Sequence, residues 1–255
     1  TGAVGNFEGM LVVFEERSIW TVSGTGQIIG NVVDFNRTKT NAQTGSVSNR
    51  VIVRIPAGAR YVDQTGKQQV TATVTLAYMT PLKDIRLFDR DNDIVNSYPL
   101  SELVESMNYA QRQKSHALHD TDRNEVSWMF AADSESEPSV AAVWNYRWGV
   151  WYEREWTFAS AVELETSSTA AVQIGGSSSR TIGGIAYQLW DGNTANGTGF
   201  TAQWMTKTLY GVNENGQPAP AYQKRWRWSD ILFTTDQNVE ITVAWLQGDA
   251  PNNAD

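Results

Sequence analysis

The feature that most constrains this chain is an alternation of apolar and small polar side chains with a period of two. It runs from residue 70 to 78 and again from residue 239 to 245. The apolar positions are Val70, Ala72, Val74, Leu76, Tyr78, Val239, Ile241, Val243 and Trp245. Side chains that alternate in this way line the two faces of a half-buried antiparallel strand. The pattern predicts two such strands and an all-β chain.

Further short segments, rich in β-branched and aromatic residues, lie between turn residues. They cover residues 11–14, 18–22, 51–55, 125–130, 141–146, 150–156, 170–174, 184–190, 200–205 and 222–233. Asp191-Gly192 and Asn196-Gly197 offer the positive-φ positions of tight hairpins, and Gly149 separates two aromatic segments. Antiparallel sheets joined by hairpins are therefore expected along most of the chain.

One segment predicts a helix. Pro99 ends the preceding segment, and Ser101 offers an N-cap. The apolar residues that follow have helical spacing, and the helix is expected to end before Ser115. They are Leu103, Val104, Met107 and Ala110. We expect one β domain over residues 1–197, in which residues 35–80 are compatible with a small inserted lobe, and a β-sandwich-like part over residues 198–255.

Composition excludes several classes of protein. Lys and Arg number 20 and Asp and Glu number 28, a net charge of −8 with both His neutral, whereas a protein that binds DNA or anionic lipid needs a concentrated cationic surface. The absence of Cys excludes a disulfide framework, a thiolate zinc site and a Cys nucleophile. The longest apolar runs, such as residues 10–14, are far shorter than the roughly 20 residues of a membrane span. We therefore expect neither membrane insertion nor an export signal.

Catalytic and metal-binding patterns are weak. His116 and His119, with Asp120 and Asp122, are the nearest approach to a metal cluster, but a three-residue spacing brings two imidazoles together only on a helix. We interpret them as polar loop or packing residues. The acidic run Asp133–Glu137 lacks the apolar neighbours that raise a carboxyl pKa, so we interpret it as a solvated loop. We expect no catalytic residue, no cofactor and no metal site.

The most distinctive feature is a Trp cluster between residues 128 and 156. Its members are Trp128, Trp144, Trp148, Trp151 and Trp156. Exposed Trp side chains would form a platform for sugar rings, and an oligomer interface would bury Trp and Arg as anchors. We expect most of them to fill the sheet core instead. A second segment, residues 224–228, interleaves cations and aromatics as a single-strand nucleic-acid binder does, but we interpret it as a salt-bridged strand.

Several segments resemble those of bacteriophage tail hub, or nozzle, proteins. The clearest are residues 124–130 (NEVSWMF) and 142–152, which contain "NYR.G.W". Three more follow the family's order: residues 11–23, 78–93 with "DIRLFDRDND", and 187–206 with "DGNTANGT". In that family these segments belong to a propeller-like β domain. The chain is shorter than hub proteins usually are, which would suit a shortened hub, an adaptor or a piece of a longer protein.

The resemblance implies a structural virion protein of the phage tail or neck, assembled in the bacterial host cytoplasm. It implies a homo-oligomeric ring, usually a hexamer, that extends the DNA-ejection channel below the portal and adaptor and carries other tail proteins or fibres. Genomic DNA would pass through without specific binding. DNA is bound mainly by cationic side chains that displace counterions from its phosphates, and an acidic lumen offers none of these. The expected subunit contacts are Trp148, Trp151, Arg154, Arg225 and Arg227, and the expected lumen residues are Glu102, Glu105, Asp133, Glu135 and Glu137.

Two alternatives stay open. A carbohydrate-binding receptor-recognition module of the tail would expose Trp side chains to sugars. A glycan-cleaving tail enzyme would place two carboxylates about 5 to 9 Å apart in a cleft.

Overall fold

The computed structural model describes residues 2–189, apart from 25–27, 30–31, 91, 155–157, 166–170 and 177–185. The chain divides into two compact units, Thr1–Gly192 and Asn193–Asp255, and every described residue belongs to the first. Four features expected from the sequence lie outside the described residues. They are Trp156 of the Trp cluster, the sandwich-like part 198–255 with its alternating segment, the turns at residues 191–192 and 196–197, and the cation-aromatic segment 224–228.

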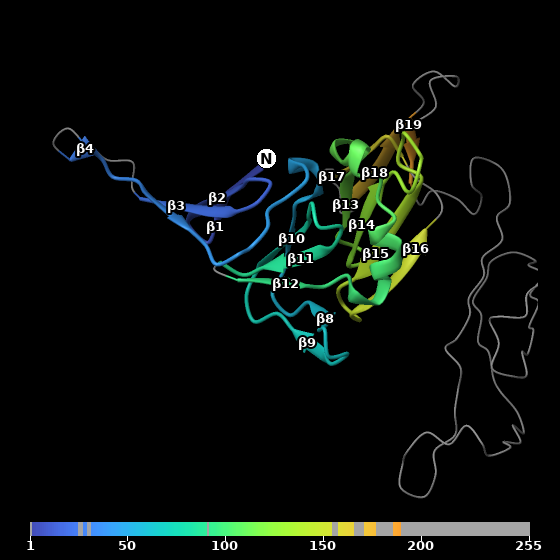
Figure 1. Cartoon of the computed structure of the whole chain (residues 1–255), viewed down its shortest axis with the longest axis horizontal. Coiled ribbons are helices and arrows are strands. Elements are labelled where there is room, and N and C mark those ends of the chain that lie inside the picture. The colour runs from blue at the N-terminus through green and yellow to red at the C-terminus, as the bar shows by residue number, and fades with distance from the viewer. Residues whose placement is uncertain are drawn as a thin grey trace, which may run out of the picture. The chain divides into compact units, whose positions relative to one another are not determined.

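The first sheet is an antiparallel meander in the order β1-β2-β3-β6 (Figure 1). Its strands are β1 (Gly2–Phe7), β2 (Met10–Phe14), β3 (Ile19–Ser23) and β6 (Asn36–Lys39), and the hairpin of β4 (Ile28–Ile29) and β5 (Val32–Val33) lies between β3 and β6 along the chain. Val12 and Phe14 are fully buried while Leu11 is exposed, so one face of this sheet points to the interior. β2 and β3 confirm two of the predicted strands.

The second sheet has the order β12-β11-β10-β7. Its strands are β7 (Val53–Ile55), β10 (Thr75–Met79), β11 (Ile85–Phe88) and β12 (Asp93–Val95), and a separate hairpin joins β8 (Arg60–Val62) to β9 (Gln68–Val70). Residues 35–80, which the sequence suggests as an inserted lobe, are divided: β6 belongs to the first sheet, and β7 and β10 belong to the second.

The strand predicted over residues 70–78 is wrong in its extent and its burial. The N–H of Thr71 donates to the carbonyl of Ala59 at 2.8 Å, and the N–H of Gly58 donates to the carbonyl of Thr71 at 2.9 Å. These bonds hold residue 71 against the loop before β8, so β9 ends at Val70 and β10 begins only at Thr75. β10 is buried along its whole length, because both faces of the second sheet are covered.

The third sheet is an antiparallel meander in the order β13-β14-β15-β16, and a three-stranded fourth sheet follows in the order β17-β18-β19. The strands are β13 (His116–Asp120), β14 (Glu125–Phe130), β15 (Val140–Asn145), β16 (Val150–Arg154), β17 (Ser160–Glu165), β18 (Ala171–Gly176) and β19 (Ala186–Gln188). β14, β15 and β16 confirm the strands predicted there. His116 and His119 lie on β13, so the loop alternative of their interpretation is wrong, whereas the buried side chain of His116 confirms the packing alternative.

The four sheets stack face to face in chain order, as three apolar layers show. The layer between the first and second sheets contains Phe7, Val12, Phe14, Ile19, Leu76, Tyr78 and Phe88. The layer between the second and third contains Ile55, Ala77, Met79, Ile85, Leu87, Val126, Trp128, Phe130, Ala142 and Trp144. The layer between the third and fourth contains Leu118, Met129, Ala141, Val143, Phe158, Ala161 and Leu189. The all-β antiparallel class is confirmed, while the described sheets do not close into a barrel and the propeller-like arrangement stays a prediction.

The predicted helix is shorter than expected. α1 covers only Ser101–Glu105, and the chain then enters a 3-10 turn, η3 (Tyr109–Lys114). The interruption has a tertiary cause, because Met107 forms a β-bridge with Ala132 and the N–H of Asn108 donates to the carbonyl of Ala131 at 2.8 Å. Two more 3-10 turns are η1 (Asn49–Val51) and η2 (Tyr98–Leu100). Within the described ranges, no helix is long and apolar enough to span a bilayer.

Candidate assembly surfaces

The segment that carries the clearest resemblance forms the hairpin of β15 and β16. The side chain of Asn145 accepts from the N–H of Trp148 at 3.1 Å, and its carbonyl accepts from the N–H of Gly149 at 2.8 Å. Gly149 has a φ of +70°, a conformation that a residue with a Cβ rarely adopts. The sequence Asn-Tyr-Arg-Trp-Gly therefore encodes a specific tight turn, as predicted from Gly149.

Trp151 lies in the core and not at a surface. Its ring stacks on Trp128 at 5.8 Å and on Trp144 at 6.0 Å between centroids. The indole Nε1 of Trp128 donates to Val51 O at 3.0 Å, and that of Trp144 donates to Arg60 O at 3.1 Å. These bonds and stacks confirm that most of the described Trp cluster fills the sheet core, and they leave Trp151 little area for contact with another subunit.

Arg154, a second expected contact residue, is committed to an ion pair inside the third sheet. Its guanidinium lies 2.7 Å from a carboxylate oxygen of Glu125, and these side chains are 14% and 10% exposed. The hydroxyl of Tyr152 donates to Glu125 at 2.6 Å. Burial, followed by the hydrogen bond to Glu125, raises the pKa of the Tyr152 phenol. Tyr152 and Arg154 share the sheet face opposite Trp151, because successive side chains of a strand point to opposite faces.

Trp148 is the expected contact residue that the structure places at the surface. Its side chain is 57% exposed, and the guanidinium of Arg147 lies 5.3 Å from the centre of its ring. The side-chain amide of Gln68 donates to the carbonyl of Trp148 at 2.9 Å, which ties the turn to β9. Arg225 and Arg227, the remaining expected contacts, lie outside the described residues.

The structure brings most of the expected lumen residues into one region. Glu102 and Glu105 lie on α1, and Asp133 and Glu135 lie in the loop between β14 and β15; all four are exposed. The N–H of Asp133 donates to the carbonyl of Ser106 at 2.7 Å, which joins the loop to the end of α1. Glu137 differs from the other four, because it forms an ion pair with Lys114 at 2.7 Å. We call the first four residues the acidic cluster.

The two His residues do not form a metal site. They lie on β13 three residues apart, so their side chains point to opposite faces of the strand. His116 is 2% exposed, and burial lowers its pKa to about 4. His119 lies 3.2 Å from the hydroxyl of Tyr146, and burial lowers its pKa as well. No group of three metal-ligating side chains occurs in the part of the chain that the structure describes.

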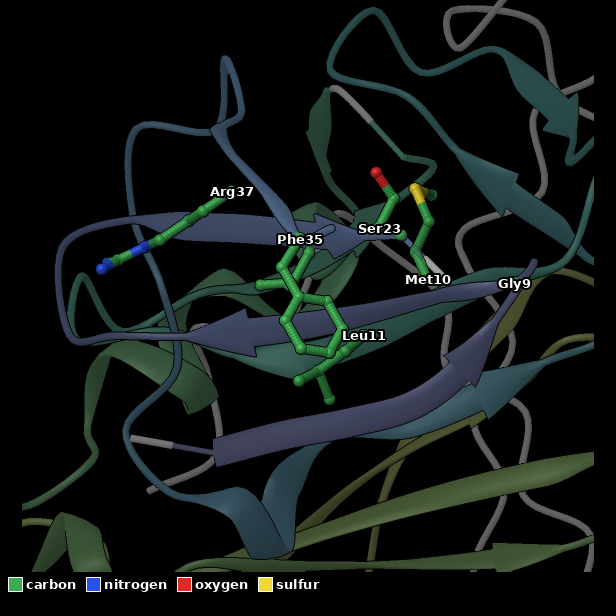
Figure 2. Close-up of a pocket in the computed structure, with 8 residues that line it drawn as sticks. Gly9, Met10, Leu11, Ser23, Phe35 and Arg37 are labelled. Atoms are coloured by element: carbon green, nitrogen blue, oxygen red, sulfur yellow. The ribbon is translucent and has the colours of Figure 1, made fainter. Parts of the chain in front are cut away.

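Among the described residues, two sheet faces expose apolar side chains that were not anticipated from the sequence. The outer face of the first sheet exposes Leu11 and Phe35 and borders an open hollow of about 460 Å³ (Figure 2). The fourth sheet exposes Val162 and Leu164, which are 50% and 44% exposed. The alternation of Val162 and Leu164 with Glu163 and Glu165 is a strand signal that could have located the second face.

Comparisons with known proteins add no assignment. No protein-family model matches the chain, and no curated protein matches it either. We therefore infer function from the geometry, exposure and charge of the described side chains.

Proposed function

We propose that this chain is a structural protein of a bacteriophage tail or neck, a hub or nozzle subunit that assembles into a homo-oligomeric ring around the DNA-ejection channel. The observation that carries the proposal is the face-to-face stack of successive antiparallel meanders. Such a stack is the arrangement of propeller blades, which the resemblance of residues 124–130 and 142–152 implies. Its place would be in the virion, between the portal with its adaptor and further tail proteins or fibres.

The charge of the chain supports a conduit. The net charge is −8, and the acidic cluster of Glu102, Glu105, Asp133 and Glu135 is exposed. A lumen lined by carboxylates repels phosphates and releases no counterions to them, so DNA slides without sticking. The acidic cluster is the part of the described surface that we assign to the lumen.

The partners of several other carboxylates favour a structural role over catalysis. Asp120 pairs with Arg123 at 3.1 Å, Glu125 pairs with Arg154, and Glu137 pairs with Lys114. These three carboxylates are thus engaged in ion pairs within the fold, as structural side chains are. We therefore propose no enzymatic activity and no cofactor for this chain.

The first experiment measures the assembly state of the full chain. Light scattering at two protein concentrations gives the mass, and negative-stain imaging gives the shape, because ring assembly depends on concentration. We expect closed rings with a central hole at the higher concentration. A monomer at every concentration, with and without a portal adaptor, would overturn the proposal.

A second experiment tests the lumen assignment in assembled particles. Glu102→Lys with Asp133→Lys should slow DNA ejection and make its rate depend more strongly on salt, because new cations bind passing phosphates. Glu153→Lys is the matched control, since Glu153 is exposed on β16 outside the acidic cluster. An unchanged ejection rate and salt dependence in the double variant would remove the acidic cluster from the lumen.

One observation favours a carbohydrate-binding module as a second candidate. Trp148 is exposed at the tip of a hairpin, where an indole ring is accessible for stacking on a sugar. If this candidate is right, host polysaccharide should change the Trp fluorescence of the chain, and Trp148→Ala should abolish the change. Flat titrations across host glycans would exclude it.

A further inference from the structure

Three stacked indole rings lie in the apolar layer between the second and third sheets, and their N–H groups are not equally satisfied. Trp128 Nε1 donates to Val51 O at 3.0 Å, and Trp144 Nε1 donates to Arg60 O at 3.1 Å. Trp151 stacks on both rings, but its Nε1 is buried and no described residue accepts from it. This layer therefore holds a buried donor to which the described residues offer no acceptor.

A buried amide with the same deficit follows β12. Asn96 is fully buried, and neither its side-chain oxygen nor its side-chain nitrogen has a hydrogen-bond partner among the described residues. Its backbone N–H donates to the carbonyl of Ile85 at 2.8 Å, so the position of this residue is fixed by the pairing of β11 with β12. Buried polar groups are costly without hydrogen bonds, and those that lack a protein partner usually bind an ordered water.

The amide of Asn96 lies on the side of the second sheet that faces this layer. Tyr78 pairs with Arg86, and Arg86 pairs with Val95, so these three side chains share the face on which Tyr78 packs against the first sheet. Successive side chains of a strand point to opposite faces. Asn96 therefore points the other way, to the side on which Ile85 packs in the layer with the third sheet.

The indole N–H and the amide lie at the same edge of the layer. β13 contacts η1, which leads into β7, and β16 contacts η2, which begins two residues after Asn96. The third sheet thus lies on the second with β16 over the β12 edge. Leu100 of η2 and Trp151 of β16 pack against the same apolar cluster. The two unsatisfied side chains therefore come from neighbouring segments.

We propose that one buried water molecule is bound between Trp151 and Asn96. Its oxygen accepts from the indole Nε1 and from the amide nitrogen, and one of its hydrogens is donated to the amide oxygen. A buried water typically makes about three hydrogen bonds, which is the number of unsatisfied groups that these two side chains offer. All three groups are neutral, so they suit water and would leave a bound ion without a counter-charge.

The bound water gives β16 the kind of anchor that its neighbours have. Trp128 of β14 and Trp144 of β15 each fasten their strand to a backbone carbonyl of the segment beneath. Trp151 would fasten β16 to the end of β12 through the water. The site lies inside one chain, so the inference stands or falls independently of ring assembly.

Nuclear magnetic resonance of the natural, isotopically labelled chain tests the site without a substitution. Cross-relaxation between water and protein protons is recorded in the laboratory and rotating frames, which separates bound water from proton exchange. We expect a water signal at the Trp151 indole N–H and the Asn96 amide, and a far weaker one at the indoles of Trp128 and Trp144, which are internal controls. The absence of a water signal at Trp151 would overturn the proposal.

A direct bond from the indole to the amide is the competing arrangement. A crystal structure with Trp151 Nε1 within about 3.2 Å of the Asn96 oxygen, and no water between them, would also overturn the proposal. Density for a water within hydrogen-bond distance of both side chains would support it.

Asn96→Leu distinguishes a hydrated amide from an unpaired one. Replacing an unpaired buried amide by an apolar side chain of similar shape stabilises a fold, whereas loss of the water leaves the Trp151 N–H without an acceptor. We therefore expect a lower urea midpoint and no water signal at Trp151. Asn92→Leu is the matched control, exposed in the turn between β11 and β12, and should leave both nearly unchanged. A higher midpoint for Asn96→Leu, or a water signal that persists at Trp151, would overturn the shared site.

Discussion

At the scale of single residues, the third sheet concentrates its polar stabilisation on Glu125. This carboxylate is nearly buried, and it accepts from Tyr152 and pairs with Arg154. Asn145 also lies within 3.3 Å of it. Breaking a buried ion pair costs far more than an exposed pair contributes, because the remaining charge has lost its solvation. Glu125 is therefore the polar side chain to which we expect the fold to be most sensitive.

We predict that Glu125→Gln lowers the free energy of unfolding by about 2 kcal/mol, since it keeps the shape of the side chain and removes the charge opposite Arg154. Urea unfolding of the full chain measures this. Glu137→Gln is the control, because its ion pair with Lys114 is almost half exposed and should contribute less than about 1 kcal/mol. Equal losses in the two variants would contradict the prediction.

A second residue-scale prediction concerns His116. Burial lowers its pKa from 6.5 to about 4, so the folded chain holds the neutral ring while the unfolded chain takes up a proton. The stability that the neutral His116 ring contributes is fully present above the pKa of this side chain in the unfolded chain, which is about 6.5. It is lost as the pH falls from about 6.5 to about 4. The loss is about 3 kcal/mol, at 1.36 kcal/mol for each unit of pKa difference.

Urea unfolding at successive pH values between those limits checks the prediction for His116. His116→Gln should lose less stability than the natural chain over the same interval, because its side chain does not titrate. The comparison with this variant removes the contribution of carboxylates, which titrate in both chains. Parallel curves for the two chains would contradict the prediction.

At the scale of elements, the hairpin of β15 and β16 joins the third sheet to the hairpin of β8 and β9. The N–H of Arg60 donates to the carbonyl of Tyr146 at 2.7 Å, and Gln68 donates to Trp148. Gly149 stands between these contacts. A Cβ on Gly149 would lie 3.1 Å from the carbonyl oxygen of Arg60 and 2.9 Å from the side-chain nitrogen of Gln68. Both the backbone conformation and the space require glycine here.

We predict that Gly149→Ala lowers the free energy of unfolding by about 2 kcal/mol, from the positive φ and the close approach of β8. Gly66→Ala is the matched control, because Gly66 has a φ of +80° and a Cβ added there would meet nothing within 4 Å. It should lose only the conformational part, about 1 kcal/mol. Denaturant midpoints at constant slope measure both, and an equal loss would show that the approach of β8 is unimportant.

At the scale of the whole molecule, the exposed acidic side chains and the exposed apolar side chains lie on different parts of the surface. The apolar layers hold the stack together and leave two apolar ends, whereas the excess negative charge includes the exposed acidic cluster. Exposed apolar side chains and the acidic cluster therefore occupy different parts of the described surface, a division that would suit the channel subunit proposed above.

We predict that the full chain does not bind DNA at physiological salt. With a net charge of −8 it cannot offer the phosphate contacts on which non-specific affinity depends. Fluorescence anisotropy of a labelled duplex and of a labelled single strand should stay flat up to about 10 μM protein, within the usual range of non-specific dissociation constants. Binding of the single strand alone would instead support the cation-aromatic segment at residues 224–228 as a nucleic-acid site.

The sequence by itself determined three strands of the third sheet, β14, β15 and β16, and the turn at Gly149, because side-chain alternation and turn chemistry act over a few neighbouring residues. It also determined the solvated acidic loop at residues 133–137. Tertiary structure decided where α1 stops, since Met107 bridges to Ala132, and it decided that Trp151 faces the core. It also decided which strand side chains are exposed among the described residues. These outcomes depend on contacts between residues far apart in the chain. A local sequence pattern does not specify which distant segment will pack against it.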